Sequence, residues 1–96
     1  MNIQILPSAI EDLYSGSVFY EKQETGLGDY FLDSLFSDID SLLLYAGIHE
    51  QIMGYYRQLS AKFPYAVYYK IINGDVLVFR VLDLRQNPEQ IKNYLM

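Results

Sequence analysis

Four basic residues in the second half of the chain are the side chains best suited to chemistry: Arg57, Lys62, Arg80 and Arg85. Cleavage of RNA by a 2′-hydroxyl needs donors that stabilise the charge of the phosphorane, and a guanidinium binds phosphate in a fixed fork. Arg85 also precedes a predicted helix start, where backbone amides favour an anion. These four residues are therefore the candidate catalytic or binding set.

A general base and a general acid are harder to find. Tyrosine and lysine have ordinary pKa values of about 10 and about 10.4, so neither serves as a base at neutral pH without strong depression. His49 has a suitable pKa, but it lies in a predicted loop beside Glu50, far in sequence from the arginines. Asp83 could take a proton, yet its carboxylate would also repel phosphate. Arg80 could equally be structural, paired with Asp75 or Asp83, so the residues alone do not favour a self-sufficient nuclease.

The composition is that of one globular domain spanning residues 1–96. Hydrophobic residues make up 51% of the chain and charged residues 20%, which suits a folded domain with a single core. The chain has no cysteine and one histidine, so we expect no disulfide and no metal site, and no motif indicates a cofactor. The N-terminal residues lack the pattern of a signal peptide and no apolar run approaches a membrane span, so we expect a cytoplasmic protein.

The net charge of −5 is unevenly distributed along the chain. Residues 1–53 contain nine acidic residues and one basic residue, whereas residues 54–96 contain three acidic and six basic residues. This asymmetry indicates either a polyanionic or acidic partner for the second half, or a sheet that happens to follow an acidic helical half. The overall acidity disfavours tight electrostatic binding of free RNA or DNA.

The first half of the chain predicts a short strand that leads into a helix. Alternating residues from Asn2 to Leu6 are typical of a strand, and Pro7 ends it. Ser8 and Glu11 have the spacing of a capping box at a helix start. The predicted core face of this helix carries Ile10, Leu13 and Tyr14.

A second helix is expected from about Asp29 to Ala46, after a break at residues 25–28. Gly47 is well placed to end it, and the small size of Gly16 would let the two helices approach closely. The helices should therefore form an antiparallel pair. The predicted core stripe of the second helix consists of Phe31, Leu35, Ile39, Leu42 and Ala46, widened by Leu32, Phe36 and Leu43.

The second half predicts a loop over residues 48–54, a strand over 55–59, a turn over 60–64 and a long hairpin. The hairpin strands cover residues 65–72 and 75–84, because Asn73-Gly74 between two β-rich runs is the strongest short-range hairpin signal. A two-residue loop gives the pairings Tyr69 with Val78, Tyr68 with Phe79, and Val67 with Arg80.

The fold class predicted is α+β: an N-terminal strand, an antiparallel helix hairpin packed on an antiparallel sheet of about four strands, and a short C-terminal helix starting at Asn87-Pro88. Both faces of the hairpin are apolar, and only the C-terminal helix is available to cover the second face. The tyrosines of the sheet could stack bases, but we favour a protein interface for them. These residues are Tyr55, Tyr56, Tyr65, Tyr68 and Tyr69.

The order of these elements, with several short motifs, resembles the RelE/ParE superfamily of toxins from type II toxin–antitoxin systems. The motifs that carry the resemblance are Pro7-Ser-Ala-Ile-Glu-Asp-Leu13, Gly28-Asp-Tyr-Phe-Leu-Asp33, Tyr56-Arg-Gln-Leu59, Tyr68-Tyr-Lys-Ile-Ile-Asn-Gly-Asp75 and Val78-Phe-Arg-Val-Leu-Asp-Leu-Arg-Gln-Asn-Pro88. Together they cover nearly the whole chain in the family's order.

The resemblance implies the toxin of a plasmid-stabilisation type of module, neutralised by a cognate antitoxin protein laid along it. ParE-like members are implied to poison DNA gyrase without a nuclease site, whereas RelE-like members are implied to cut mRNA on the ribosome with several Lys and Arg residues. Asp83 stands where the family commonly has a histidine, and the chain is unusually acidic for this group. We therefore expect ParE-like binding of an essential target. The alternatives are a ribosome-dependent mRNA endoribonuclease and a non-toxic relative that only binds a protein.

Overall fold

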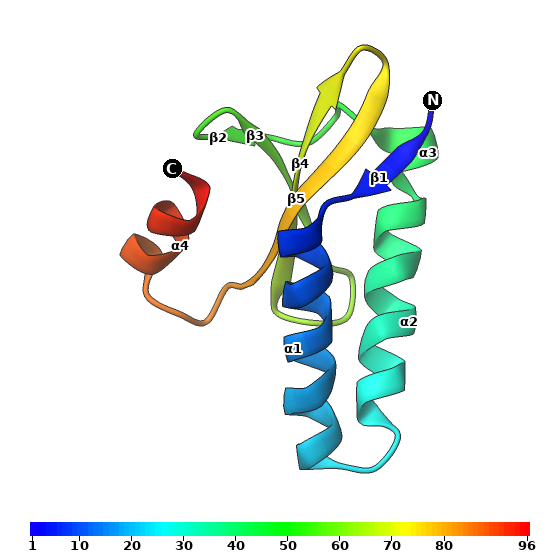
Figure 1. Cartoon of the computed structure of the whole chain (residues 1–96), viewed down its shortest axis with the longest axis vertical. Helices are drawn as coiled ribbons and strands as arrows, with labels where there is room; N and C mark the ends of the chain where they lie inside the picture. Colours follow the sequence, from blue (N-terminus) through cyan, green and yellow to red (C-terminus); the bar gives the residue numbers. More distant parts are fainter.

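The computed structural model describes all 96 residues, arranged as a helix pair, a central sheet and a terminal helix (Figure 1). The elements in chain order are β1 (Ile3–Ile5), α1 (Pro7–Gln23), α2 (Leu27–Asp40), α3 (Leu42–Tyr45), β2 (Gln51–Ile52), β3 (Tyr55–Leu59), β4 (Tyr65–Ile72), β5 (Asp75–Asp83) and α4 (Pro88–Leu95). The helix pair α1–α2 and the terminal helix α4 lie on opposite sides of the sheet. The predicted α+β fold is confirmed. No helix is both long and apolar enough to cross a membrane.

The sheet has five strands in the order β1-β5-β4-β3-β2, rather than about four. The additional strand is β2, which pairs with β3 across Met53 and Gly54 in a segment expected to be a loop. Its two residues give too short a run for alternation to be recognised. The first strand joins the sheet as expected, but it runs parallel to β5, so the sheet is mixed. Met53 and Gly54, like Asn73 and Gly74 in the β4–β5 turn, have positive φ angles, as a two-residue hairpin turn requires.

The helix starts differ from the predicted ones. Leu6 occupies the N-cap position of α1 without a side-chain hydrogen bond and Pro7 opens the helix, so the capping box predicted at Ser8 and Glu11 is wrong. Proline at this position needs no amide partner and already has a helical φ. At the start of α2, Glu21 of the preceding helix accepts hydrogen bonds from the backbone N–H groups of Gly26 (3.0 Å) and Gly28 (3.0 Å). These bonds let α2 begin at Leu27, two residues before the predicted start.

The predicted second helix is divided in two at Ser41, where α2 ends and the short α3 begins. The Ser41 hydroxyl accepts a hydrogen bond from the amide of Gln58 on β3 (2.9 Å), and the carbonyl of Asp38 accepts another from the same amide (2.7 Å). The Asp38 carboxylate also accepts from the Ser60 hydroxyl (2.6 Å). The end of α2 is therefore tied to the sheet through polar groups that the apolar stripe did not indicate. Gly47 follows α3 with a φ of 95°, in agreement with the predicted helix end.

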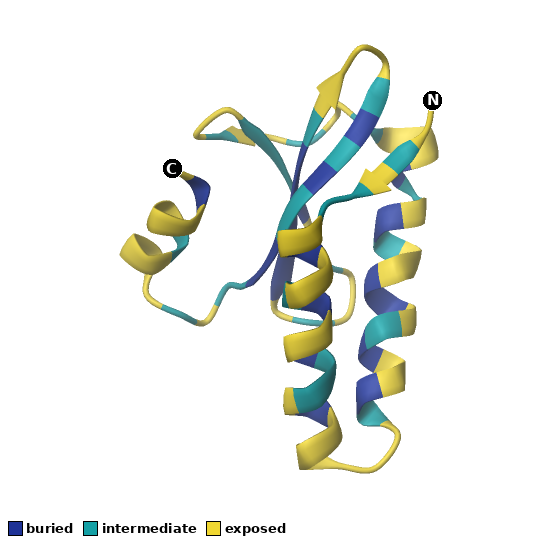
Figure 2. Ribbon diagram, in the orientation of Figure 1, coloured by how far each residue is buried: buried dark blue, intermediate teal, exposed yellow.

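The main core lies between α1, α2 and one face of the sheet, and a second, smaller cluster lies between the other face and α4 (Figure 2). Gly16 is buried against Phe31, as expected from its size: a Cβ atom there would lie 2.5 Å from the Phe31 ring. Four residues expected in the core are instead exposed: Ile10, Tyr14, Phe36 and Leu43. The buried face of α1 is formed by Ala9, Leu13, Gly16 and Tyr20.

A β-bulge in β5 changes the predicted register of the hairpin. Tyr69 pairs with Val78 as expected, but Tyr68 pairs with Arg80 instead of Phe79, and Val67 pairs with Val81. Val78 and Val81 consequently both face the main core, which regular alternation would forbid. The extra residue therefore places Phe79 and Arg80 on the α4 side of the sheet.

Candidate functional site

Arg80 is held by Asp12 on α1. Its guanidinium donates from Nε and one terminal nitrogen to the two carboxylate oxygens of Asp12, at 2.8 and 2.9 Å. The same carboxylate accepts from the backbone N–H of Val81 (2.9 Å), and the guanidinium carbon lies 4.6 Å from the centre of the Tyr94 ring. The hydrogen bonds to Asp12 raise the pKa of Arg80. Arg80 is thus in a structural ion pair, as the alternative interpretation of the sequence held, but its partner is neither Asp75 nor Asp83.

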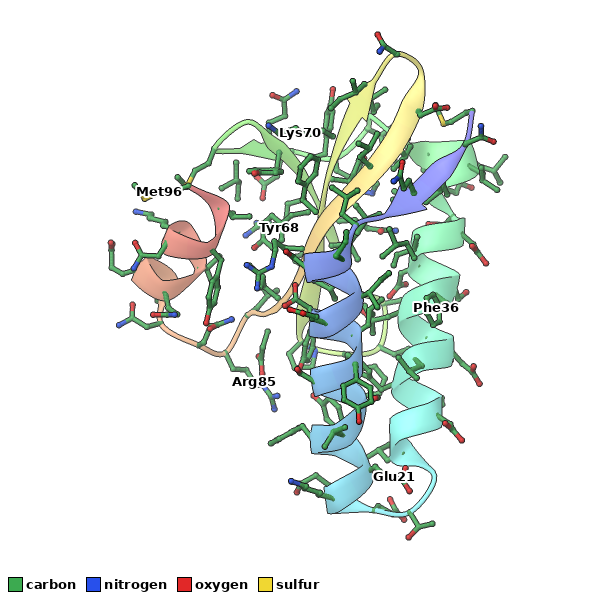
Figure 3. All side chains as sticks on the ribbon, in the orientation of Figure 1. Glu21, Phe36, Tyr68, Lys70, Arg85 and Met96 are labelled. Carbon is green, nitrogen blue, oxygen red and sulfur yellow. The ribbon has the colours of Figure 1, made fainter.

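Arg85 follows β5, in the same region as Arg80, and forms its own ion pair with a different carboxylate. Its side chain donates to both carboxylate oxygens of Asp83, at 3.0 and 2.8 Å, and its backbone N–H donates to the same group (2.8 Å). A further hydrogen bond joins Arg85 to the Tyr20 hydroxyl (3.2 Å). The bonds from Arg85 lower the pKa of Asp83, so this carboxylate is a poor candidate for a general base. Figure 3 shows Arg85 below the gap between α1 and α4.

An open pocket of about 340 Å³ lies between α1, β5 and α4. Arg80 and the carboxylates of Asp12 and Asp83 line it, together with the aromatic rings of Phe19 and Tyr94. Arg80 is the one cationic group that lines the pocket, and it is already paired with the carboxylate of Asp12. The pocket is therefore a mixed polar and aromatic surface, not a cationic one.

Arg57 and Lys62 occupy other parts of the molecule. Arg57 forms an ion pair with Glu50 and lines a separate pocket of about 320 Å³ beneath α4, and its Nε atom is buried without a hydrogen-bond partner. Lys62 lies in the turn before β4, with Nζ 5.3 Å from the centre of the Tyr30 ring of α2. The structure thus brings Arg80 and Arg85 to one region but does not gather the four candidates around one phosphate position.

The tyrosines and the histidine considered for acid–base catalysis do not combine a suitable pKa with a position beside these arginines. Burial raises the pKa of Tyr65, helped by the nearby Asp83 carboxylate, to about 12. Burial also raises the pKa of Tyr68 and of Tyr69, and lowers the pKa of His49. The Tyr69 hydroxyl accepts from the N–H of Gly47 (2.9 Å) and lies 2.5 Å from Nδ1 of His49. This histidine is therefore engaged in a structural contact.

The tyrosines of the sheet are mostly core residues, so the predicted interface is wrong for three of the five. Tyr65, Tyr68 and Tyr69 are buried, the last two almost completely, while Tyr55 and Tyr56 are partly covered. Figure 3 places Tyr68 between the sheet and α4, so on this face α4 supplies the cover that was expected from a partner protein.

Three residues around Arg80 and on the α4 side of the sheet were not predicted from the sequence. Asp12 holds Arg80, Tyr94 stacks on it, and Lys70 lies over the rings of Tyr55 (4.6 Å) and Phe79 (5.5 Å) on the same face of the sheet. Asp12 carries a usable signal, because an acid three residues after a buried alanine and one before a buried leucine lies beside the core face of its helix. The other two depend on the bulge and on the docking of α4.

The arrangement of β1, the antiparallel helix pair, the antiparallel strands β2 to β5 and the terminal helix defines an α+β fold in which a helix pair packs on one face of a mixed sheet. A solved structure described as the chromosomal ParDE TA system from P. aeruginosa has a chain that superposes with a TM-score of 0.75, covering 88% of this chain and 97% of that chain. The two sequences are 12% identical, so the similarity is one of fold, and at that level the predicted resemblance is confirmed. No protein-family model matches the sequence, and no curated protein matches it.

Proposed function

We propose that this protein is the toxin of a type II toxin–antitoxin module, and that it acts in the cytoplasm by binding an essential target rather than by cutting RNA. The fold it shares with a chain of a ParDE toxin–antitoxin system supports the first part. The observation that carries the second part is that each arginine of the candidate site already has its own carboxylate: Arg57 has Glu50, Arg80 has Asp12, and Arg85 has Asp83.

A nuclease would need these guanidinium groups to contact the scissile phosphate. Each contact would first have to replace a carboxylate, and the Asp12 carboxylate is retained by three hydrogen bonds within a partly buried site. The remaining carboxylates would then repel the phosphate. A tyrosine with a raised pKa cannot serve as a base at neutral pH, and His49 is bonded elsewhere.

A target-binding toxin needs none of these groups to be free. Its contacts would come from the exposed side chains around the pocket between α1, β5 and α4, where Arg85 and Phe19 are half exposed. DNA gyrase is the target we propose, as in ParE-like proteins, with a cognate antitoxin as the second partner. The whole chain, residues 1–96, would act as one domain.

Induced expression in bacteria tests this proposal, with growth, cellular mRNA and DNA supercoiling followed together. We expect growth arrest with altered supercoiling and intact mRNA. Arg85→Ala should reduce the arrest, because this side chain is half exposed at the proposed contact surface, whereas the similarly exposed Lys92→Ala should not. Because Arg85 also donates to the hydroxyl of the buried Tyr20, a native melting curve of Arg85→Ala is the control for folding. Arrest with mRNA cleavage would establish the endoribonuclease instead, and absence of arrest would leave a protein-binding relative without toxicity.

A further inference from the structure

The pocket beneath α4 differs from the pocket between α1, β5 and α4 in the balance of its charges. It has a volume of about 320 Å³ and lies between the sheet and the terminal helix. Both charged residues that line it, Arg57 on β3 and Lys92 on α4, are basic, and no acidic residue lines it. The aliphatic part of its wall consists of Ile52, Leu84, Pro88 and Ile91. The pocket therefore combines positive charge with an apolar lining.

Arg57 is the arginine whose hydrogen bonding is incomplete. Arg80 and Arg85 each donate from Nε and from a terminal nitrogen to both oxygens of one carboxylate. Arg57 donates to a carboxylate from one terminal nitrogen alone, that of Glu50, and its Nε atom is buried without a hydrogen-bond partner. A buried donor without an acceptor destabilises the fold, so native structures usually pair it with a protein group, a water or a bound ion. The unpaired Nε therefore indicates a missing acceptor at this site.

The groups around Arg57 suit a second carboxylate. The Glu50 side chain is 61% exposed, so water screens its ion pair with Arg57. Tyr68 also lines the pocket and lies between the sheet and α4 (Figure 3). Burial raises the pKa of Tyr68 and the charge of the nearby Arg57 opposes this rise, so the hydroxyl is protonated at neutral pH. A protonated phenol beside a guanidinium provides a further hydrogen-bond donor for an anion.

Lys92 supplies a second positive charge from the helix side of the pocket. Its Nζ atom lies 3.7 Å from a carboxylate oxygen of Glu89, and the two side chains are 58% and 76% exposed. An ion pair this exposed contributes little free energy, so Lys92 can turn toward a bound anion at small cost. The long side chain of lysine allows this movement without a shift of α4. The pocket thus offers donors from β3, β4 and α4 to one negative group.

We propose that this pocket binds a small organic monocarboxylate with an apolar body of about six carbon atoms, a size that suits its volume. The carboxylate would accept from Arg57, the Tyr68 hydroxyl and Lys92, and the aliphatic wall would cover the apolar body. Inorganic phosphate would leave that wall without a partner and would carry more charge out of water. The inference goes beyond the proposed function, because this pocket shares no lining residue with the pocket between α1, β5 and α4.

Amide chemical-shift titration of the intact protein with hexanoate tests the inference. Hexanamide has the same body without the charge, acetate has the charge without the body, and inorganic phosphate is the competing anion. We expect hexanoate to bind with a Kd of about 1 mM, with shifts centred on Ile52, Tyr68 and Ile91, and each other probe to bind at least about tenfold more weakly. Absence of hexanoate binding up to about 10 mM, shifts centred elsewhere, or equal binding of any other probe would overturn the proposal.

Variants locate the site independently of the shifts. Arg57→Gln should weaken hexanoate binding by at least about tenfold, because a charge-assisted hydrogen bond is lost. Lys22→Gln removes the same charge at the exposed end of α1, outside the pocket, and should leave binding unchanged. Lys92→Gln changes an exposed position of α4 and should weaken binding by about threefold or more, which keeps the test valid if Arg57→Gln does not fold. Unchanged binding in Arg57→Gln with a native melting curve would refute the site.

Acetyl-leucine distinguishes a free acid from the carboxyl end of a polypeptide, because it carries a carboxylate beside a peptide group. It should bind no more tightly than hexanoate; a clear preference for it would mean that the pocket accepts a chain terminus, and would overturn the proposal. None of these readouts depends on growth arrest, so the inference can fail while the proposed toxin function holds, and the reverse.

Discussion

The contact between Asp12 and Arg80 makes the most demanding prediction about stability, because one carboxylate joins α1 to two successive residues of β5. Asp12→Ala removes two hydrogen bonds from the guanidinium and one from the backbone N–H of Val81. Val81 is 2% exposed, so its N–H would lose its protein partner and be poorly hydrated, at a cost of about 1–3 kcal/mol.

Loss of Asp12 would cost less free energy at the Arg80 guanidinium than at a deeply buried cation. The Arg80 side chain is 22% exposed and stacks on Tyr94, so water can replace part of what Asp12 provides, and we assign it about 1 kcal/mol. The total is about 2–4 kcal/mol, or about 10–25 °C in Tm for a domain of this size. Urea unfolding and thermal melting of Asp12→Ala measure it directly.

The matched control is Glu11→Ala, which removes the neighbouring carboxylate of α1 that has no partner. It should change stability by less than about 0.5 kcal/mol. Asp12→Asn should cost less than Asp12→Ala, because the amide oxygen can still accept from Val81. In a double-mutant cycle with Arg80→Leu, the coupling energy should be about 1 kcal/mol or more. If Asp12→Ala is as stable as Glu11→Ala, the carboxylate does not hold α1 to the sheet and the reasoning fails.

Three further predictions follow from the core and from the titrating groups. Gly16→Ala should destabilise the fold by about 1–3 kcal/mol despite the better helix propensity of alanine, because its Cβ would lie 2.5 Å from the ring of Phe31; chemical denaturation measures this. Arg85 lowers the pKa of Asp83 in the folded state, so the ionised Asp83 stabilises the fold. This contribution should be complete above the unfolded pKa of about 4 and should disappear as the pH falls through the folded pKa. Asp83→Asn should remove this part of the acid dependence of the urea midpoint. Tyr65 has a folded pKa of about 12, so its protonated form should stabilise the fold below about pH 10, and this contribution should be lost as the pH rises toward the folded pKa. Tyr65→Phe should remove the phenolate step that occurs at the highest pH in an ultraviolet titration.

Each of these has a result that would contradict it. Ser15→Ala, an exposed change one residue before Gly16, should be neutral or slightly stabilising, and an equally neutral Gly16→Ala would show that Phe31 can move aside. An acid dependence that persists unchanged in Asp83→Asn would assign it to other carboxylates. If Tyr65→Phe leaves the last phenolate step in place, another of the ten tyrosines is responsible for it.

Local patterns predicted the parts of the fold that depend on neighbouring residues. Asn73-Gly74 fixed the long hairpin because both positions need a positive φ, and Asn87 caps α4 by accepting from the N–H of Glu89, as a helix N-cap should. The apolar stripe of α2 was correct at Phe31 and Leu35. It failed at Phe36 because an apolar side chain at the right period still needs a neighbouring layer, and the chain provides none on that side.

The candidate site was less predictable because it depends on one inserted residue. Without the bulge, Arg80 would point to the same side as Val78 and face the main core, where its charge would have no partner. The shift of one position directs it to the edge of α1, where Asp12 can reach it. No sequence pattern in β5 marks the bulge, so the pairing across 68 residues could not be derived from the strand alone.

The charge asymmetry of the sequence takes on a different meaning once side-chain partners are known. Four of the seven basic residues form ion pairs, and Lys62 and Lys70 lie over aromatic rings, so the basic half of the sequence does not present a basic surface. Eight of the twelve acidic residues have no ion-pair partner, and most of these belong to α1, α2 and the turn between them. The distribution therefore favours a basic partner on the helix side, and it gives no electrostatic reason for a polyanion to bind the sheet.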